Sequence, residues 1–405
     1  MTATAPTGPA TGGTGPPGRP FAPAAPVPAA ARPVVTGLGV LSAAGHGLDP
    51  LLDAAAHGKA AFGPVTRFDV AARRTTRAAL LPDHLLPDHL PLDGPLPLAG
   101  IVLDAIGQAC RRAALTGAQA AALPVLLAVH SDERTGATTR AVAAGTAARW
   151  GAPGVTRVYT GACVAAATAV ADAAVLVATG RHERVLVAAG HLVEPGVFAV
   201  FDAGRALARD GELRPFSAGR TGTLLADAAA AVLIEAAPAA ERRGAAVLAR
   251  LAGWGRAGDA HHVCRPEPDG HGLSRAIRSA LARAGAAPAE VGYVNANGTG
   301  STLADLAEAR ALHRVFGPHT AELPVSSSKS VHGHALEASA LLELAVTIGS
   351  LGTGLLPVNA GALGPDPEIG LGLVLDGPHT ARPRYALSLN SAFGGANTAL
   401  LLAAA

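Results

Sequence analysis

The chain contains few aromatic, sulfur-containing and charged residues. Of its 405 residues, 3% are Phe, Trp or Tyr, one is Met, three are Cys and 15% are charged. Hydrophobic residues nevertheless make up 49%, so the interior must be built mainly from Ala, Val and Leu. This composition excludes a disordered chain, and the length is sufficient for one large domain or two packed halves.

Paired cysteines and metal-binding patterns are missing as well. Cys110, Cys163 and Cys264 are odd in number, lie far apart and form no CxxC pair, which argues against a disulfide framework or a zinc site and favours a reducing cytoplasm. Among the fifteen histidines there are two tight groups, His261 with His262 and His332 with His334. Neither group has the spacing of a metal-binding motif, so we expect no metal.

Strong charge bias and long uninterrupted apolar runs are also absent. The net charge is +2 and no basic run with interleaved aromatics occurs, so the sequence does not indicate nucleic-acid binding. No secretory leader pattern follows Met1, and the longest uncharged stretch, about 345–364, is broken by glycines and a proline. We therefore expect a soluble cytoplasmic protein with neither a nucleic-acid nor a membrane partner.

Short apolar runs alternate with helical patterns along the chain. Residues 1–32 are rich in Ala, Pro and Gly and are expected to form a disordered tail. The rest predicts two similar α/β halves, 33–236 and 237–405, with a mostly parallel sheet covered on both faces. The predicted strands are 33–40, 123–129, 155–160, 184–189, 229–234, 247–251, 291–294, 385–389 and 397–402. The predicted helices are 48–57, 98–115, 138–150, 164–180, 273–284, 303–315 and 336–351, and 68–98 is expected to be an irregular loop in which Leu-Pro-Asp-His occurs twice.

Cys163 is the first candidate for chemistry. It lies between a β-branched run, 155–160, and a helical run of small residues that starts at Val164. Unpaired N–H groups and the positive end of the helix dipole favour a thiolate there, as a nucleophile requires. The alternative is a buried cysteine that acts as a small hydrophobic residue.

Six short motifs in one order point to a family. They are Val34-Val35-Thr36-Gly37-Leu38-Gly39, Thr160-Gly161-Ala162-Cys163, Arg214-Pro215-Phe216-Ser217, 294–301 (Val-Asn-Ala-Asn-Gly-Thr-Gly-Ser), 327–334 (Ser-Ser-Lys-Ser-Val-His-Gly-His) and Asn390-Ser391-Ala392-Phe393-Gly394-Gly395. From about Pro33 to the C-terminus, the series resembles the β-ketoacyl-[acyl-carrier-protein] synthases of fatty-acid and type II polyketide pathways. That resemblance implies a thiolase fold with two α-β-α-β-α layered halves, and a dimer.

The resemblance also implies roles for individual residues. Cys163 would accept an acyl group from the phosphopantetheine arm of an acyl carrier protein, without any other cofactor. His334 would hydrogen-bond the thioester or malonyl carbonyl, and Lys329 would orient the site. The N–H groups of Cys163 and Phe393 would form the oxyanion hole, and Phe393 would gate the acyl tunnel. The supporting acidic positions would be Asp305, Glu308 and Glu343, which are equally compatible with structural ion pairs.

Asn297 is the departure with the largest consequence. It stands where the family's second catalytic histidine is expected, and Asn can neither titrate nor carry positive charge. Its presence predicts that loading of the thiol persists while decarboxylative condensation is impaired. The alternative is that Asn suffices, because thiolase-fold relatives with a Cys-His-Asn set do condense.

Two smaller departures concern the loop at Phe393 and the neighbour of His334. Ala392 replaces a glycine before Phe393, and its Cβ disfavours positive φ, so the loop is expected to be stiffer. His332 replaces a small residue and could substitute for the missing imidazole, although side chains at i and i+2 rarely converge.

Three functions follow as hypotheses. The first is a ketosynthase-like acyltransferase of polyketide or secondary-metabolite biosynthesis that transfers the acyl group of Cys163 without efficient elongation. The second is a condensing enzyme that uses a Cys163, Asn297 and His334 site. The third is a non-catalytic partner resembling a chain-length factor, which would pair with a ketosynthase as a heterodimer; the retained Cys163 counts against it.

Overall fold

The computed structural model describes residues 32–86 and 96–405. The expected disordered tail, 1–32, and the second Leu-Pro-Asp-His copy, which begins at Leu86, fall almost entirely outside these ranges. Between Phe68 and Leu86 the chain forms only a two-residue strand and one 3-10 turn, as the irregular-loop prediction implies.

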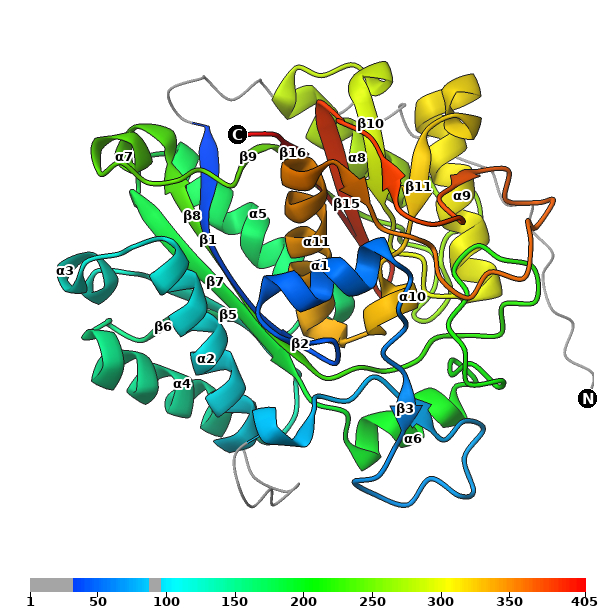
Figure 1. The fold of residues 1–405 in the computed structure, drawn as a ribbon, viewed down its shortest axis with the longest axis horizontal. Coiled ribbons are helices and arrows are strands. Elements are labelled where there is room, and N and C mark those ends of the chain that lie inside the picture. Colours follow the sequence, from blue (N-terminus) through cyan, green and yellow to red (C-terminus); the bar gives the residue numbers. More distant parts are fainter. Residues whose placement is uncertain (1–31, 87–95) are drawn as a thin grey trace, which may run out of the picture.

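The strands form one long sheet and two small ones (Figure 1). In chain order they are β1 Pro33–Ser42, β2 Gly45–His46, β3 Gly63–Pro64, β4 Arg77–Ala78, β5 Val125–Ala128, β6 Val155–Tyr159, β7 Arg184–His191, β8 Ala228–Ala236, β9 Ala249–Gly258, β10 Val291–Asn295, β11 Pro324–Ser326, β12 Leu355–Leu356, β13 Gly372–Leu373, β14 His379–Thr380, β15 Tyr385–Ser391 and β16 Ala396–Ala403.

Helices cover both faces of the long sheet. The α-helices are α1 Leu48–Ala56, α2 Leu96–Arg112, α3 Gly117–Ala121, α4 Thr135–Trp150, α5 Ala165–Ala178, α6 Pro195–Ala203, α7 Ala237–Arg242, α8 His271–Ala284, α9 Thr302–Phe316, α10 Lys329–His332 and α11 Ser339–Thr353. The 3-10 turns are η2 Asp83–Leu85, η3 Ala162–Val164, η4 Pro288–Glu290, η5 Gly317–Ala321 and η6 Leu336–Ala338.

The two halves repeat one strand order. In the first half the order is β6-β5-β7-β8-β1, and in the second it is β11-β10-β15-β16-β9, with the halves joined where β1 pairs β9 at Val34 and Val35. The outer strands of each half pair in parallel and the inner ones antiparallel. The expectation of a mostly parallel sheet is therefore wrong. A strand covered on both faces is a continuous apolar run in either direction, so its sequence does not reveal its direction.

Five layers result, as the family resemblance implied. Helices α2 and α4 cover one outer face, α8 and α9 cover the other, and α5 with α11 forms the middle layer (Figure 1). The middle layer is built from small side chains: the buried positions of α5 are seven alanines and two valines. Among the described residues, the stretch Leu336–Thr353 is long and apolar enough to cross a bilayer, but 89% of it is buried, so it is a core helix.

Glycines set the distance between each outer helix and the sheet. A Cβ on Gly37 or Gly39 of β1 would lie 2.3 or 2.0 Å from a carbonyl oxygen of α2. A Cβ on Gly253 or Gly255 of β9 would lie 2.0 or 1.8 Å from a carbonyl oxygen of α8. Real Cβ atoms cannot approach so closely, so these strands and helices are in backbone-to-backbone contact.

Candidate active site

Cys163 lies in the turn η3, directly before α5. Its side chain is 6% exposed and packs in an apolar cluster with Val193, Phe198 and Leu336. The preceding residue, Ala162, has φ of 51°, a left-handed conformation that is rare outside glycine. The backbone therefore turns sharply between β6 and α5 and presents the thiol at the helix start.

His334 lies against Cys163. Its Nε2 is 3.0 Å from the Cys163 Sγ, and its Nδ1 is 2.8 Å from the Ser339 hydroxyl. The Ser339 hydroxyl also accepts the Ala335 N–H at 2.8 Å. The backbone of His334 is held by Leu224 O and Ala226 N, so the ring is fixed from two elements. This brings a nucleophile and a base within hydrogen-bonding reach. The sequence-based role of His334, a hydrogen bond to the thioester or malonyl carbonyl, stays a prediction.

Both groups are neutral in the resting state. Burial, together with the nearby Glu337 carboxylate, raises the pKa of Cys163 to about 12. Burial and the Lys329 charge hold the pKa of His334 well below its ordinary value. The expectation that the helix end favours a thiolate is therefore wrong, because desolvation outweighs the helix dipole. The proton rests on sulfur and His334 Nε2 is available to accept it.

Lys329 connects two further predicted residues, Glu343 and Asn297. Its Nζ lies 2.5 Å from Glu343 Oε1, 2.8 Å from the Asn297 carbonyl and 3.2 Å from Asn297 Oδ1, and both Lys329 and Glu343 are fully buried. The second oxygen of Glu343 accepts from Asn390 Nδ2. This network fixes Asn297 just beyond the end of β10.

The other two predicted acids hold backbone N–H groups, and Asp305 also lies 3.7 Å from Arg220 Nε in an ion pair. Glu308 accepts the N–H groups of Asn297 and Gly298 at 2.7 and 2.8 Å, and burial raises the pKa of Glu308 to about 7. Asp305 accepts the N–H groups of Phe216 and Thr299, and burial raises the pKa of Asp305 to about 6. Both acids thus shape the loop that carries Asn297.

Phe393 lies in the turn between β15 and β16, is 56% exposed and packs 5.9 Å from the ring of Phe201. Ala392 contacts the apolar cluster around Cys163. The left-handed residues of this turn are Gly394 and Gly395, with φ of 88° and 76°. The oxyanion and gating roles of the Phe393 loop stay predictions.

His332 does not replace the missing imidazole. Its Nδ1–H donates to the Gly333 carbonyl at 2.8 Å, and its Nε2 accepts from the Ser328 hydroxyl at 3.1 Å. Burial lowers the pKa of His332 to about 3, so the ring is a neutral structural group.

Sequence reasoning missed a second polar group near Cys163. Glu337 in η6 is 1% exposed and accepts from His130 Nδ1 at 2.9 Å. Its other oxygen lies 3.6 Å from Nδ1 of His191, the last residue of β7. Two features of the sequence could have indicated this polar group. One is a charged residue three positions after His334, and the other is a histidine at the end of a continuous apolar strand.

Alkylation measures the resting state of the thiol. Because the pKa of Cys163 is raised to about 12, its rate of modification by iodoacetamide should rise with pH up to pH 10 without a plateau. Glu337→Gln removes a nearby negative charge and should increase that rate. Peptide mass spectrometry in a Cys264→Ser background, which lacks the exposed thiol, would follow the reaction. A plateau near pH 7 would contradict the assignment.

Comparisons with known proteins agree with this geometry. The family models described as β-ketoacyl synthase, N-terminal domain and C-terminal domain match residues 110–240 and 248–362, together more than half of the chain. Nodulation protein E of Rhizobium meliloti is 38% identical over 244 residues, 60% of each chain. The 3-oxoacyl-[acyl-carrier-protein] synthase 2 of Staphylococcus aureus is 37% identical over 207 residues, 50% of this chain and 51% of that protein. The matched region thus spans at most about 60% of these relatives.

Solved structures match over a longer range. A β-ketoacyl synthase from Burkholderia phymatum has a TM-score of 0.81 at 26% identity, and the ishigamide ketosynthase/chain length factor has 0.83 at 25%. Each comparison covers 92% of this chain and 99% of the other. The chain belongs to the β-ketoacyl synthase family and has the thiolase fold of its ketosynthases.

Proposed function

We propose that the protein is a ketosynthase-like acyltransferase of polyketide or related secondary metabolism. It accepts an acyl group on Cys163 and passes the group to an acceptor without efficient decarboxylative elongation. The observation that carries the proposal is the intact contact of Cys163 with His334, 3.0 Å, beside an Asn at position 297.

Loading needs only the pair that is in place. His334 Nε2 takes the thiol proton as Sγ attacks the carbonyl of an incoming thioester. The carbon–sulfur bond of the donor then breaks, and the leaving thiolate takes the proton from His334. Ser339 stabilises the imidazolium by accepting from Nδ1. No other acid or base is required for this exchange of one thioester for another.

Condensation needs more than this pair. Loss of carbon dioxide from a malonyl group leaves an enolate, which a second imidazole would stabilise. The Oδ1 of Asn297 is occupied by Lys329, and its side chain carries no charge. An acid–base group in such a position contributes about 10²–10⁴-fold to rate. We therefore expect elongation to be slow.

The condensing enzyme is the second candidate, and one observation favours it. With Oδ1 of Asn297 turned to Lys329, the amide Nδ2 remains as a donor that could hydrogen-bond an enolate oxygen. A non-catalytic chain-length-factor role is disfavoured, since such a subunit has no use for the contact between Cys163 and His334.

Two structural neighbours support a proposal for the donor and the partner subunit. One structural neighbour is described as a type II polyketide acyl-carrier protein in complex with its ketosynthase, and another as a ketosynthase/chain length factor. By analogy, we propose a carrier-protein thioester as donor, the carrier's phosphopantetheine arm as the sole cofactor, a homodimer or heterodimer as the assembly, and the cytoplasm as the location.

One assay separates the candidates. Purified protein is incubated with acyl- or malonyl-carrier protein, and intact mass and carbon dioxide release are measured. We expect an acyl adduct that Cys163→Ala abolishes, slow carbon dioxide release by the wild type, and about 10²-fold faster release after Asn297→His.

Two results would contradict the proposal. No adduct with any competent donor would exclude the acyltransferase. Fast release by the wild type, little changed by Asn297→His, would identify the condensing enzyme instead.

A further inference from the structure

A buried carboxylate lies in the turn that follows His334. Glu337 belongs to η6, three residues after His334 and two before the start of α11, and it is 1% exposed. A carboxylate at such depth is stable only when cations or hydrogen-bond donors compensate its charge. The groups that hold Glu337 therefore also hold the turn that carries it.

Two histidines from the first half of the chain hold Glu337. His130, which follows β5, donates its Nδ1–H to Glu337 Oε1 at 2.9 Å. His191, the last residue of β7, has its Nδ1 3.6 Å from Glu337 Oε2. The two rings lie 6.4 Å apart, at 70° to one another. Glu337 thus fastens a turn of the second half to the ends of two strands of the first half.

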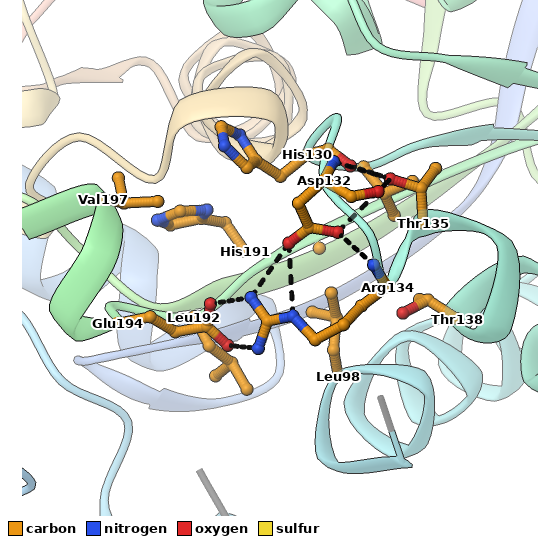
Figure 2. A pocket seen from close by; sticks show the side chains of 12 residues that line it. Leu98, His130, Asp132, Arg134, Thr135, Thr138, His191, Leu192, Glu194 and Val197 are labelled. Atoms are coloured by element: carbon orange, nitrogen blue, oxygen red, sulfur yellow. Dashed lines mark hydrogen bonds and ion pairs between the residues drawn. The ribbon is translucent and has the colours of Figure 1, made fainter. Parts of the chain in front are cut away.

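The neighbouring carboxylates are occupied by another cation. Arg134 donates to Asp132 at 2.9 Å and forms a bidentate pair with Glu194. Figure 2 shows the Arg134 guanidinium between these two carboxylates, with the rings of His130 and His191 beyond them. The carboxylate that binds the His130 ring directly is that of Glu337.

The turn η6 contacts the active site at two places. Leu336 packs in the apolar cluster that contains Cys163, and η6 contacts η3, the turn of Cys163. His334 lies two residues before Leu336, so a shift of η6 also moves the backbone of the base. The φ of Leu336 is 40°, a left-handed conformation that a branched side chain rarely adopts. Such a conformation persists only where the surrounding contacts maintain it, and the hold on Glu337 is one of them.

His130 makes this hold dependent on pH. Its side chain is 39% exposed and that of Glu337 is 2% exposed, so the ring exchanges protons with solvent. The hydrogen bond to Glu337 raises the pKa of His130 against the effect of burial, and the charges of Asp132 and Glu194 add to the rise. Burial alone would raise the pKa of Glu337, but the two histidines outweigh it and lower that pKa, so Glu337 stays ionised. The charged pair therefore exists at low pH and is lost as the pH rises through the raised pKa of His130.

We propose that Glu337 is a positioning residue for the Cys163–His334 pair, and that charged His130 strengthens its hold on η6 and so speeds acylation of the thiol. This rests on the proposed function, because it concerns the loading step. A carboxylate accepts a stronger hydrogen bond from a charged donor than from a neutral one. Loading should therefore be about tenfold faster while His130 is charged than when it is neutral.

Other titrating groups determine how the rates are compared. The groups that face His130 are Glu337 in η6, Asp132 and Arg134 after β5, His191 at the end of β7 and Glu194 after it. Cys163, with a pKa of about 12, and His334, with a pKa well below its ordinary value, keep one charge state between pH 5.5 and 8.5. Asp305 and Glu308 titrate within that range. Each rate is therefore divided by the rate of His130→Asn at the same pH, since the amide of this variant can donate to Glu337 but carries no charge.

The loading rate tests the proposal. In a Cys264→Ser background, each protein is mixed with an acetyl-pantetheine thioester at pH 5.5 and at pH 8.5, and intact mass follows the adduct. The wild type should load about tenfold faster than His130→Asn at pH 5.5 and at about the same rate at pH 8.5. His130→Lys, which keeps a cation at this partly exposed position, should load about tenfold faster than His130→Asn at both pH values. A merely structural role of the ring would not give a difference that disappears with pH and returns with lysine.

His46 provides the matched control. It is another solvent-accessible histidine whose ring is paired with a carboxylate, 2.8 Å from Asp104 of α2. Because this pair lies outside η6, His46→Asn should load within about twofold of the wild type at both pH values.

Amide exchange keeps the hold testable if no protein loads. Exchange of residues 334–338, followed by mass spectrometry at pH 5.5, should be about tenfold faster in His130→Asn than in the wild type. Absence of loading together with this faster exchange refutes the proposed function alone. Equal exchange in the two proteins overturns the hold on η6. A ratio of wild-type to His130→Asn loading that stays constant from pH 5.5 to 8.5 overturns its role in loading, as does a His130→Lys protein that loads no faster than His130→Asn.

Discussion

Replacing His334 by alanine is expected to slow acylation of Cys163 by about 10²–10⁴-fold. Burial raises the pKa of Cys163 to about 12, so the thiol is protonated at pH 7 and loading depends on a base that removes the proton during attack. His334 Nε2, 3.0 Å from Sγ, is that base. The measurement is the rate of adduct formation at saturating donor.

The neighbouring histidine provides the control. His332 is equally buried, but both of its ring nitrogens bond within its own turn, to Gly333 and Ser328. His332→Asn should therefore lower the unfolding temperature while loading by the folded protein changes less than tenfold. A loading rate in His334→Ala within threefold of the wild type would show that the contact with Cys163 is not catalytic.

Lys329→Met is expected to lower the free energy of unfolding by about 3–5 kcal/mol, a large share of the total for a folded protein. The substitution leaves the fully buried Glu343 carboxylate without its cation and leaves the Asn297 carbonyl without its donor. The shift of the midpoint in urea unfolding measures the loss.

The double variant Lys329→Met/Glu343→Gln separates two causes of the lost stability, the unpaired charge of Glu343 and the altered packing around residue 329. Because no unpaired charge then remains in the interior, much of the lost stability should return. If the free energy of unfolding of Lys329→Met lies within 1 kcal/mol of the wild-type value, the ion pair does not stabilise the fold.

Periodicity alone predicted most of the layered fold. The apolar runs at 184–189 and 229–234 lie within strands β7 and β8, and the helices predicted at 273–284 and 303–315 differ from α8 and α9 by only one or two residues at their ends. Strand direction could not be predicted, because it is set by distant connections. The short helix α6 was not predicted because its apolar sequence has no clear polar face.

The candidate site was predicted from motifs but its electrostatics were not. The contact of Cys163 with His334 and the pair of Lys329 with Glu343 join residues that sequence order had already grouped. The charge state of the thiol depends on burial, which a local pattern does not report. The proximity of Glu337 to His191 depends on a turn and the end of a strand that are 146 positions apart and meet only in the fold.

The glycines that hold the outer helices also bear on the origin of the chain. Strands β1 and β9 are each ten residues long, and each has glycines at its fifth and seventh positions. In both, the two glycines face helix carbonyls four residues apart, Ala109 and Ala105 in α2 and Ala280 and Ala276 in α8. Two halves with the same strand order and the same contact at equivalent positions are what the duplication of one ancestral unit leaves behind. The first half carries the nucleophile, Cys163, and the second half carries the base, His334.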